Sequence, residues 1–103
     1  MINYGTINYT QNTATGNDQS ETTKVYVVKS AYGNNIDIMT RADAKEMEKW
    51  DNAEILGYYT IIHPWLLAGT WEEINSKFCR MALNHMNEAG LLTQNDCGCY
   101  FMK

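Results

Sequence analysis

Residues 70–90 read TWEEINSKFCRMALNHMNEAG, and this pattern predicts an amphipathic helix over about 70–89. Thr70 and Glu73 have the spacing of a capping box, in which each side chain accepts a hydrogen bond from the other residue's backbone amide. Gly90 stands where a helix often ends in a left-handed turn. The helical repeat of about 100° per residue puts the following side chains on one face, which is expected to pack on a sheet: Trp71, Ile74, Phe78, Met81, Ala82, His85, Met86 and Ala89.

The preceding chain supplies about four strands for that sheet. A β-branched and aromatic run followed by turn residues predicts a hairpin over residues 24–39, and residues 55–62 are typical of a buried strand. Residues 2–10 predict another strand, and a short last strand is expected after the helix, at residues 99–102. The apolar pattern of the first strand shifts by five residues between Ile2/Tyr4 and Ile7/Tyr9, so a β-bulge at Gly5 would be needed to keep both pairs on one face.

A second, shorter helix is expected over about 41–51, with Thr40 as its N-cap. Residues 11–23 are almost entirely polar and predict a mobile loop. The sequence therefore predicts an α+β fold in a single domain, residues 1–103. Its small, mainly antiparallel sheet of about four strands is packed by one long amphipathic helix, about 70–89, and one short helix, about 41–51.

Composition narrows the classes of protein to which this chain can belong. The 103 residues are 45% hydrophobic and carry a net charge of −4, with Arg41 and Arg80 as the two arginines. Direct nucleic-acid binding is not expected, because it normally needs clustered lysine and arginine side chains. The apolar tract 55–68 is shorter than the roughly 20 residues of a membrane span. No export signal is recognised, and three cysteines suggest no disulfide framework, so a cytoplasmic location is expected.

Cys97 and Cys99 are the pair that metal chemistry would use first. One Cys-x-Cys supplies half of a structural zinc site, which needs four ligands. His85, His63 or Cys79 could complete the site, but Cys79 and His85 lie about 240° apart around one helix. The favoured interpretation is ordinary thiols, with His85 as a core imidazole bonded to a carbonyl or a tyrosine hydroxyl, and His63 in a surface turn.

Catalytic signatures are missing from the sequence. No serine lies in a Gly-x-Ser-x-Gly turn, no glycine-rich phosphate loop is present, and Glu46/Glu48 and Glu72/Glu73 are too close in sequence to converge on a helix. The chain is therefore not expected to be an enzyme, and no cofactor or catalytic residue is predicted.

In its size, its acidity, its Asn- and Tyr-rich composition and its lack of a catalytic signature, the chain resembles the small inhibitors carried by phages and mobile elements, of which anti-CRISPR proteins are one kind. The resemblance implies a non-enzymatic protein-binding module that blocks a host defence protein, such as a CRISPR-Cas nuclease complex, in the cytoplasm of the host cell. The acids that would face the target's nucleic-acid groove are Asp43, Glu46, Glu48, Asp51, Glu54, Glu72 and Glu73.

Two other hypotheses remain open from the residues alone. The first is a small metal- or thiol-dependent protein that uses Cys97 and Cys99, with His85 or Cys79 as a further ligand. The second is a structural subunit that forms a homodimer through an exposed strand of the hairpin or of the N-terminal segment.

Overall fold

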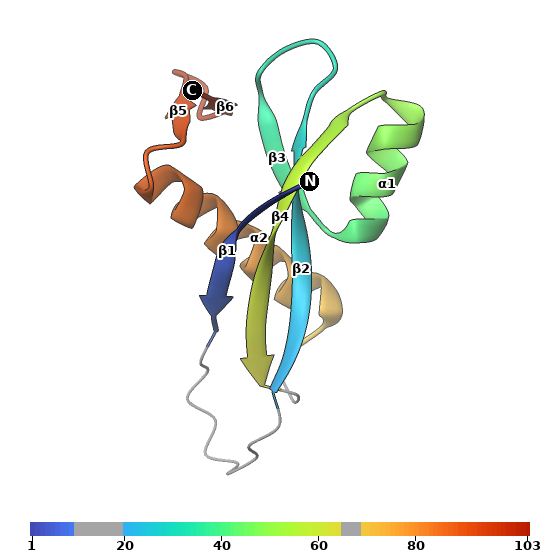
Figure 1. Ribbon diagram of the computed structural model, residues 1–103, viewed down its shortest axis with the longest axis vertical. Helices are drawn as coiled ribbons and strands as arrows, with labels where there is room; N and C mark the ends of the chain where they lie inside the picture. The colour runs from blue at the N-terminus through green and yellow to red at the C-terminus, as the bar shows by residue number, and fades with distance from the viewer. Residues whose placement is uncertain (10–19, 65–68) are drawn as a thin grey trace.

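A four-stranded sheet with helices packed on it forms the body of the protein (Figure 1). The structure is a computed structural model, and it describes residues 1–9, 20–64 and 69–103. The elements follow one another as β1 (Ile2–Asn8), β2 (Ser20–Lys29), β3 (Ile36–Met39), α1 (Arg41–Trp50), β4 (Glu54–Pro64), α2 (Trp71–Glu88), β5 (Leu92–Gln94) and β6 (Tyr100–Met102). The predicted α+β class is confirmed.

The sheet has the strand order β1-β4-β2-β3. β2 is antiparallel to both β3 and β4, whereas β1 is parallel to β4. The predicted hairpin is thus confirmed, and two of the three pairings in the sheet are antiparallel. The C-terminal strands β5 and β6 form a separate two-stranded sheet, of which the sequence pattern predicted only the second strand.

Helix α2 covers one face of the sheet and runs behind it in Figure 1. The predicted N-cap is confirmed, since Thr70 Oγ1 accepts a hydrogen bond from the Glu73 amide at 3.3 Å, and Gly90 has the left-handed φ of +76°. The buried side chains of α2 repeat every four residues and pack on the apolar face of β2, β3 and β4: Ile74, Phe78, Ala82 and Met86. The buried stripe is narrower than predicted, because Trp71 is 63% exposed and His85 and Ala89 also lie at the surface.

Helix α1 packs on the opposite face of the sheet. Val27 and Val28 are consecutive and both buried, so β2 sends one side chain to each face. Val28 joins a smaller apolar cluster with Met39, Ala44 and Ala53 under α1, and Val27 belongs to the larger cluster under α2. At the end of α1, the Trp50 side chain is 72% exposed.

The predicted β-bulge in β1 is confirmed. Asn3 pairs with Tyr58 and Gly5 with Tyr59, so Tyr4 is the extra residue. Tyr4, Ile7 and Tyr9 all pack against the larger core as a result. Gly5 has a φ of +144°, which a residue with a side chain rarely adopts.

Two predictions at the lower end of the sheet need correction. β2 begins at Ser20, so residues 20–23, which were assigned to the polar loop, form a strand; the rest of that loop, 11–19, lies outside the described residues. His63 was expected in a surface turn, but it pairs with Glu21 inside the sheet and is 1% exposed. Its Nε2 lies 2.8 Å from Thr23 Oγ1, because the longer β2 brings this hydroxyl opposite β4.

Candidate partner-binding site

The edge strand β3 places a carboxylate between the two helices. Ile36 and Ile38 point into the larger core, so the intervening Asp37 points away from it and is exposed. Its Oδ1 accepts a hydrogen bond from the Ile38 amide at 2.8 Å. The bond occupies a backbone donor of the strand and holds the carboxylate at the edge of the sheet.

Two adjoining hollows follow this edge, one of about 400 Å³ on the side of α1 and one of about 720 Å³ on the side of α2. They share Asp37, Met39 and Asp43, so they form one continuous depression. We call it the acidic groove; its carboxylates are those of Asp37, Asp43, Glu46, Asp51 and Glu72. Among its described lining residues there is no lysine or arginine, and Met47 and Trp50 add apolar surface.

The structure brings together four of the seven acids that the sequence selected. Asp43, Glu46 and Asp51 face the groove from α1, and Glu72 faces it from α2. Asp37 joins them without having been predicted, although its place between two buried isoleucines in a short strand could have shown that it is exposed.

The other three selected acids lie outside the groove. Glu48 forms a surface ion pair with Lys45 at 3.8 Å on α1. Glu54 is the first residue of β4 and pairs in register with Lys29. Glu73 turns back toward Gly69, so that a Cβ on this glycine would lie 2.9 Å from its Oε2. These acids therefore serve as natural controls for charge placed elsewhere on the same molecule.

Cys79 lines the part of the acidic groove next to α2. Burial, together with the negative charges of Asp37 and Asp43, raises the pKa of its thiol from 9.0 to about 11. The thiol is therefore almost wholly protonated near neutral pH. It is a poor nucleophile there, because the thiolate is the reactive form.

Cys79 is expected to alkylate much more slowly than Cys97 and Cys99, which are exposed. At pH 8 a two-unit rise in pKa lowers the thiolate fraction about a hundredfold, and the rate should climb as the pH approaches 11. A timed iodoacetamide pulse followed by peptide mass spectrometry measures each site. In urea the difference in alkylation rate between Cys79 and the two exposed cysteines should vanish. Equal rates in the folded protein would contradict the raised pKa of Cys79.

Because the folded state favours the protonated thiol of Cys79, this group should also lower the free energy of unfolding as the pH rises from about 9 to about 11.

Of the candidate metal ligands, Cys97 and Cys99 take part in local structure through their backbone amides, and His85 through its ring. The backbone amides of Cys97 and Cys99 both donate to Asn95 Oδ1, at 3.1 and 2.9 Å, and so close the turn between β5 and β6. His85 lies on α2, with its Nδ1 3.1 Å from the Tyr59 hydroxyl. Nowhere in the described chain do three His, Cys, Asp or Glu side chains gather in a way that could hold a metal ion.

His85 belongs to a cluster of aromatic rings. Its ring meets the Tyr59 ring edge-on with the centroids 5.2 Å apart, and Tyr59 stacks on Tyr4 at 5.8 Å. Burial raises the pKa of both tyrosines, and the pKa of Tyr59 also rises through its proximity to Tyr4. The predicted tyrosine partner is confirmed, but His85 itself is exposed, so its contact links α2 to the sheet at the surface.

No protein-family model, curated protein or solved structure matches this chain. Of the helices in the described residues, neither α1 nor α2 has both the length and the apolar character needed to cross a membrane.

Proposed function

We propose that the protein is a non-enzymatic inhibitor, encoded by a phage or mobile element, that binds a host defence protein such as a CRISPR-Cas nuclease complex in the host cytoplasm. The observation that carries this proposal is the acidic groove. Five carboxylates from α1, β3 and α2 line one depression without a cation among its described residues. A surface that binds nucleic acid presents the opposite pattern, with lysine and arginine arranged to contact phosphates.

The groove also has the mixed character of protein interfaces. Trp50, at 72% exposed, and Met47 offer apolar area next to the carboxylates. Tryptophan is enriched among the residues that dominate binding energy, while surrounding charges select the partner and speed the encounter. The target's basic groove is therefore expected to bind with its cations over Asp43, Glu46 and Glu72, in competition with nucleic acid.

The test has two steps. First, a tagged form of this protein is used to capture a CRISPR-Cas nuclease complex from host lysate, with and without nuclease treatment. Second, the purified complex is tested in a DNA cleavage assay. Capture should persist after nuclease treatment, since the contact is between proteins. Adding the inhibitor should displace labelled guide-matched DNA from the complex and stop cleavage.

Two double variants separate the groove from net charge. Each acid-to-lysine reversal changes the charge by two units, so Glu46→Lys/Asp51→Lys and Glu48→Lys/Glu54→Lys both raise the net charge from −4 to 0. The first pair lies in the groove and should weaken binding roughly tenfold or more, about 1.4 kcal/mol. The second pair lies outside and should change binding far less.

Glu72→Lys and Glu73→Lys form a second matched comparison between neighbours. Only Glu72 lines the groove, so only its reversal should weaken binding strongly. Equal losses within each matched comparison would show that overall charge is responsible and would reject the groove as the contact surface. If no defence nuclease is bound or inhibited, the proposed function fails.

A further inference from the structure

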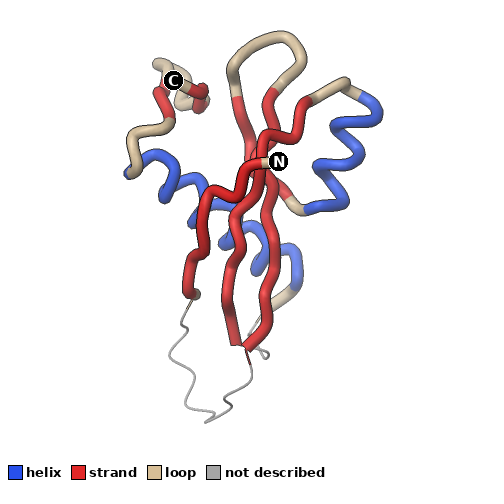
Figure 2. The backbone as a smooth tube through the Cα atoms, viewed as in Figure 1, coloured by secondary structure: helices blue, strands red, loops and turns tan. Residues whose placement is uncertain are grey.

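The strand β2 has an open edge over its first half. It contains ten residues, but β3 pairs only with the segment from Tyr26 to Lys29. At Thr40 the chain leaves the sheet and enters α1, so β3 does not continue along β2. Figure 2 shows β2 and β4 running on together below the end of β3. Among the described strands, residues 20–25 of β2 therefore pair with β4 alone.

The alternation of backbone hydrogen bonds between β2 and β3 indicates which backbone groups of β2 face this edge. The Ser30 amide donates to the Asn35 carbonyl, and the β2–β3 register runs without a shift back to Tyr26. Residues two apart in a strand point their backbone groups the same way. Thr22 and Lys24 therefore direct their N–H and C=O groups toward the open side, where they form a template for one more strand.

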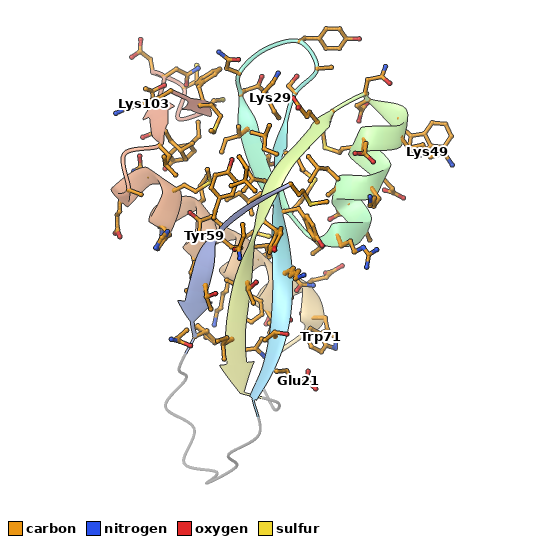
Figure 3. The ribbon with its side chains drawn as sticks, viewed as in Figure 1. Glu21, Lys29, Lys49, Tyr59, Trp71 and Lys103 are labelled. Carbon is orange, nitrogen blue, oxygen red and sulfur yellow. The ribbon has the colours of Figure 1, made fainter. Side chains whose placement is uncertain are left out.

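A hollow of about 510 Å³ lies along this edge, and we call it the β2 groove. Tyr26 lines it from the strand, and Trp71 lines it from the first turn of α2. Figure 3 shows Trp71 beside the lower half of β2. Trp71 is exposed although its place on the helix predicted burial. Its side chain therefore forms an apolar wall next to the outward-facing backbone groups of Thr22 and Lys24.

The charge of the β2 groove is opposite to that of the acidic groove. Its charged lining residues in the described chain are Lys24 and Arg41, with no carboxylate among them. Neither cation forms an ion pair with a described carboxylate; Lys24 Nζ instead lies 4.7 Å from the centre of the Tyr58 ring. In a chain with a net charge of −4, this local excess of positive charge favours an anionic partner.

We propose that the β2 groove binds an extended acidic segment of a partner protein, which adds as a strand to the open edge of β2. Its backbone would pair with Thr22 and Lys24, which gives affinity that depends little on sequence. Because side chains alternate along a strand, acidic residues at every second position would lie on the face that carries Lys24, beside Arg41. The intervening side chains would lie on the opposite face of the sheet.

A second copy of this chain fits the edge less well than an acidic segment. In an antiparallel pair of identical edges, the two-fold axis brings the same short segment of both copies together. Two copies of Lys24 and of Arg41 would then lie in one interface, and like charges across paired strands are destabilising. The charge of the groove therefore selects a partner of different composition.

The experiment titrates ¹⁵N-labelled protein with a blocked hexapeptide of alternating valine and glutamate, and with the same peptide carrying lysine in place of glutamate. The glutamate peptide should shift signals along β2 and slow hydrogen exchange at the amides of Thr22 and Lys24. It should bind at least tenfold more tightly than the lysine peptide. The double variant Lys24→Glu/Arg41→Glu should reverse this preference.

Thr22→Pro tests the backbone contact without altering charge. Its amide points to the open edge, so proline removes an outward donor and leaves the bonds to β4 in place. Binding of the glutamate peptide should fall at least fivefold, whereas Thr22→Ala, which keeps the amide, should bind like the wild type. A control spectrum shows whether each variant remains folded.

Three results would overturn the proposal: equal affinity for the two peptides, shifts that lie away from β2, or no binding of the glutamate peptide. Sedimentation without peptide gives a further check, since a dimer that Thr22→Pro dissolves would mean that the edge binds a second copy. The variant Glu46→Lys/Asp51→Lys should bind the peptide normally. Failure of the acidic groove as a nuclease inhibitor is therefore distinguishable from failure of the β2 groove.

Discussion

Phe78→Ala is expected to lower the free energy of unfolding by about 3–5 kcal/mol, the range for removing a large aromatic side chain from a core. Phe78 is fully buried at the middle of α2. Its ring meets the Tyr9 ring edge-on at 5.5 Å and the His63 ring at 5.0 Å. The substitution would therefore remove contacts of α2 with β4 and with Tyr9, the residue after β1, and leave a cavity that rigid strands cannot fill.

Urea unfolding followed by circular dichroism measures this loss. Lys77→Ala is the matched control, since Lys77 is the exposed neighbour on the same helix and its replacement should change stability by less than about 0.5 kcal/mol. Phe78→Leu keeps much of the volume and should cost less than alanine. A Phe78→Ala variant as stable as Lys77→Ala would mean that α2 does not pack on the sheet through this face.

The helices could be predicted because their signals are local. The Thr70 cap and the left-handed Gly90 each act within a few residues, and so does the Thr40 cap, which accepts from the Asp43 amide at 3.4 Å. The bulge at Gly5 was predictable for a similar reason, since the spacing of Tyr4 and Ile7 requires it once both must face one core.

Burial at element ends could not be predicted in the same way. His63 is buried because β2 extends back to Ser20 and supplies the Thr23 hydroxyl, a contact between residues forty positions apart. Trp71 lies on the expected face of α2 but is 63% exposed, and Trp50 at the end of α1 is 72% exposed. Helical periodicity gives the direction of a side chain, whereas the extent of the sheet decides whether anything covers it.

The acidic groove was predictable only in part. At 100° per residue, Asp43, Glu46 and Asp51 fall on the same side of α1 as Met47 and Trp50, but this does not show that α2 brings Glu72 to the same depression. Asp37 completes the groove through the pairing of β3 with β2, which depends on register between strands. The open edge of β2 depends on where β3 ends, which is again a property of the assembled sheet.

Gly57→Ala is expected to displace β1 from the sheet and to lower the free energy of unfolding by about 1–3 kcal/mol or more, as overpacking does. A Cβ at Gly57 would overlap the backbone carbonyl of Ile2 and would lie 2.6 Å from Cε2 of Tyr4. A flexible side chain could move aside, but the Ile2 carbonyl belongs to the strand that pairs with Gly57. The clash can therefore be relieved only if the backbone of β1 shifts.

Hydrogen exchange distinguishes this local effect from general destabilisation. In Gly57→Ala the amides of β1 should lose protection more than those of the β2–β3 hairpin, because the parallel pairing with β4 is the contact under strain. Gly33→Ala is the control. Gly33 lies in the hairpin turn without a positive φ, and an added Cβ would lie 3.2 Å from the Asn35 side-chain oxygen, which can give way. If Gly57→Ala kept the hydrogen-exchange protection of the β1 amides and the stability of the protein as well as Gly33→Ala does, β1 could not lie as close to β4 as the structure places it. The stacking of Tyr4 on Tyr59, which depends on that approach, would have to be abandoned with it.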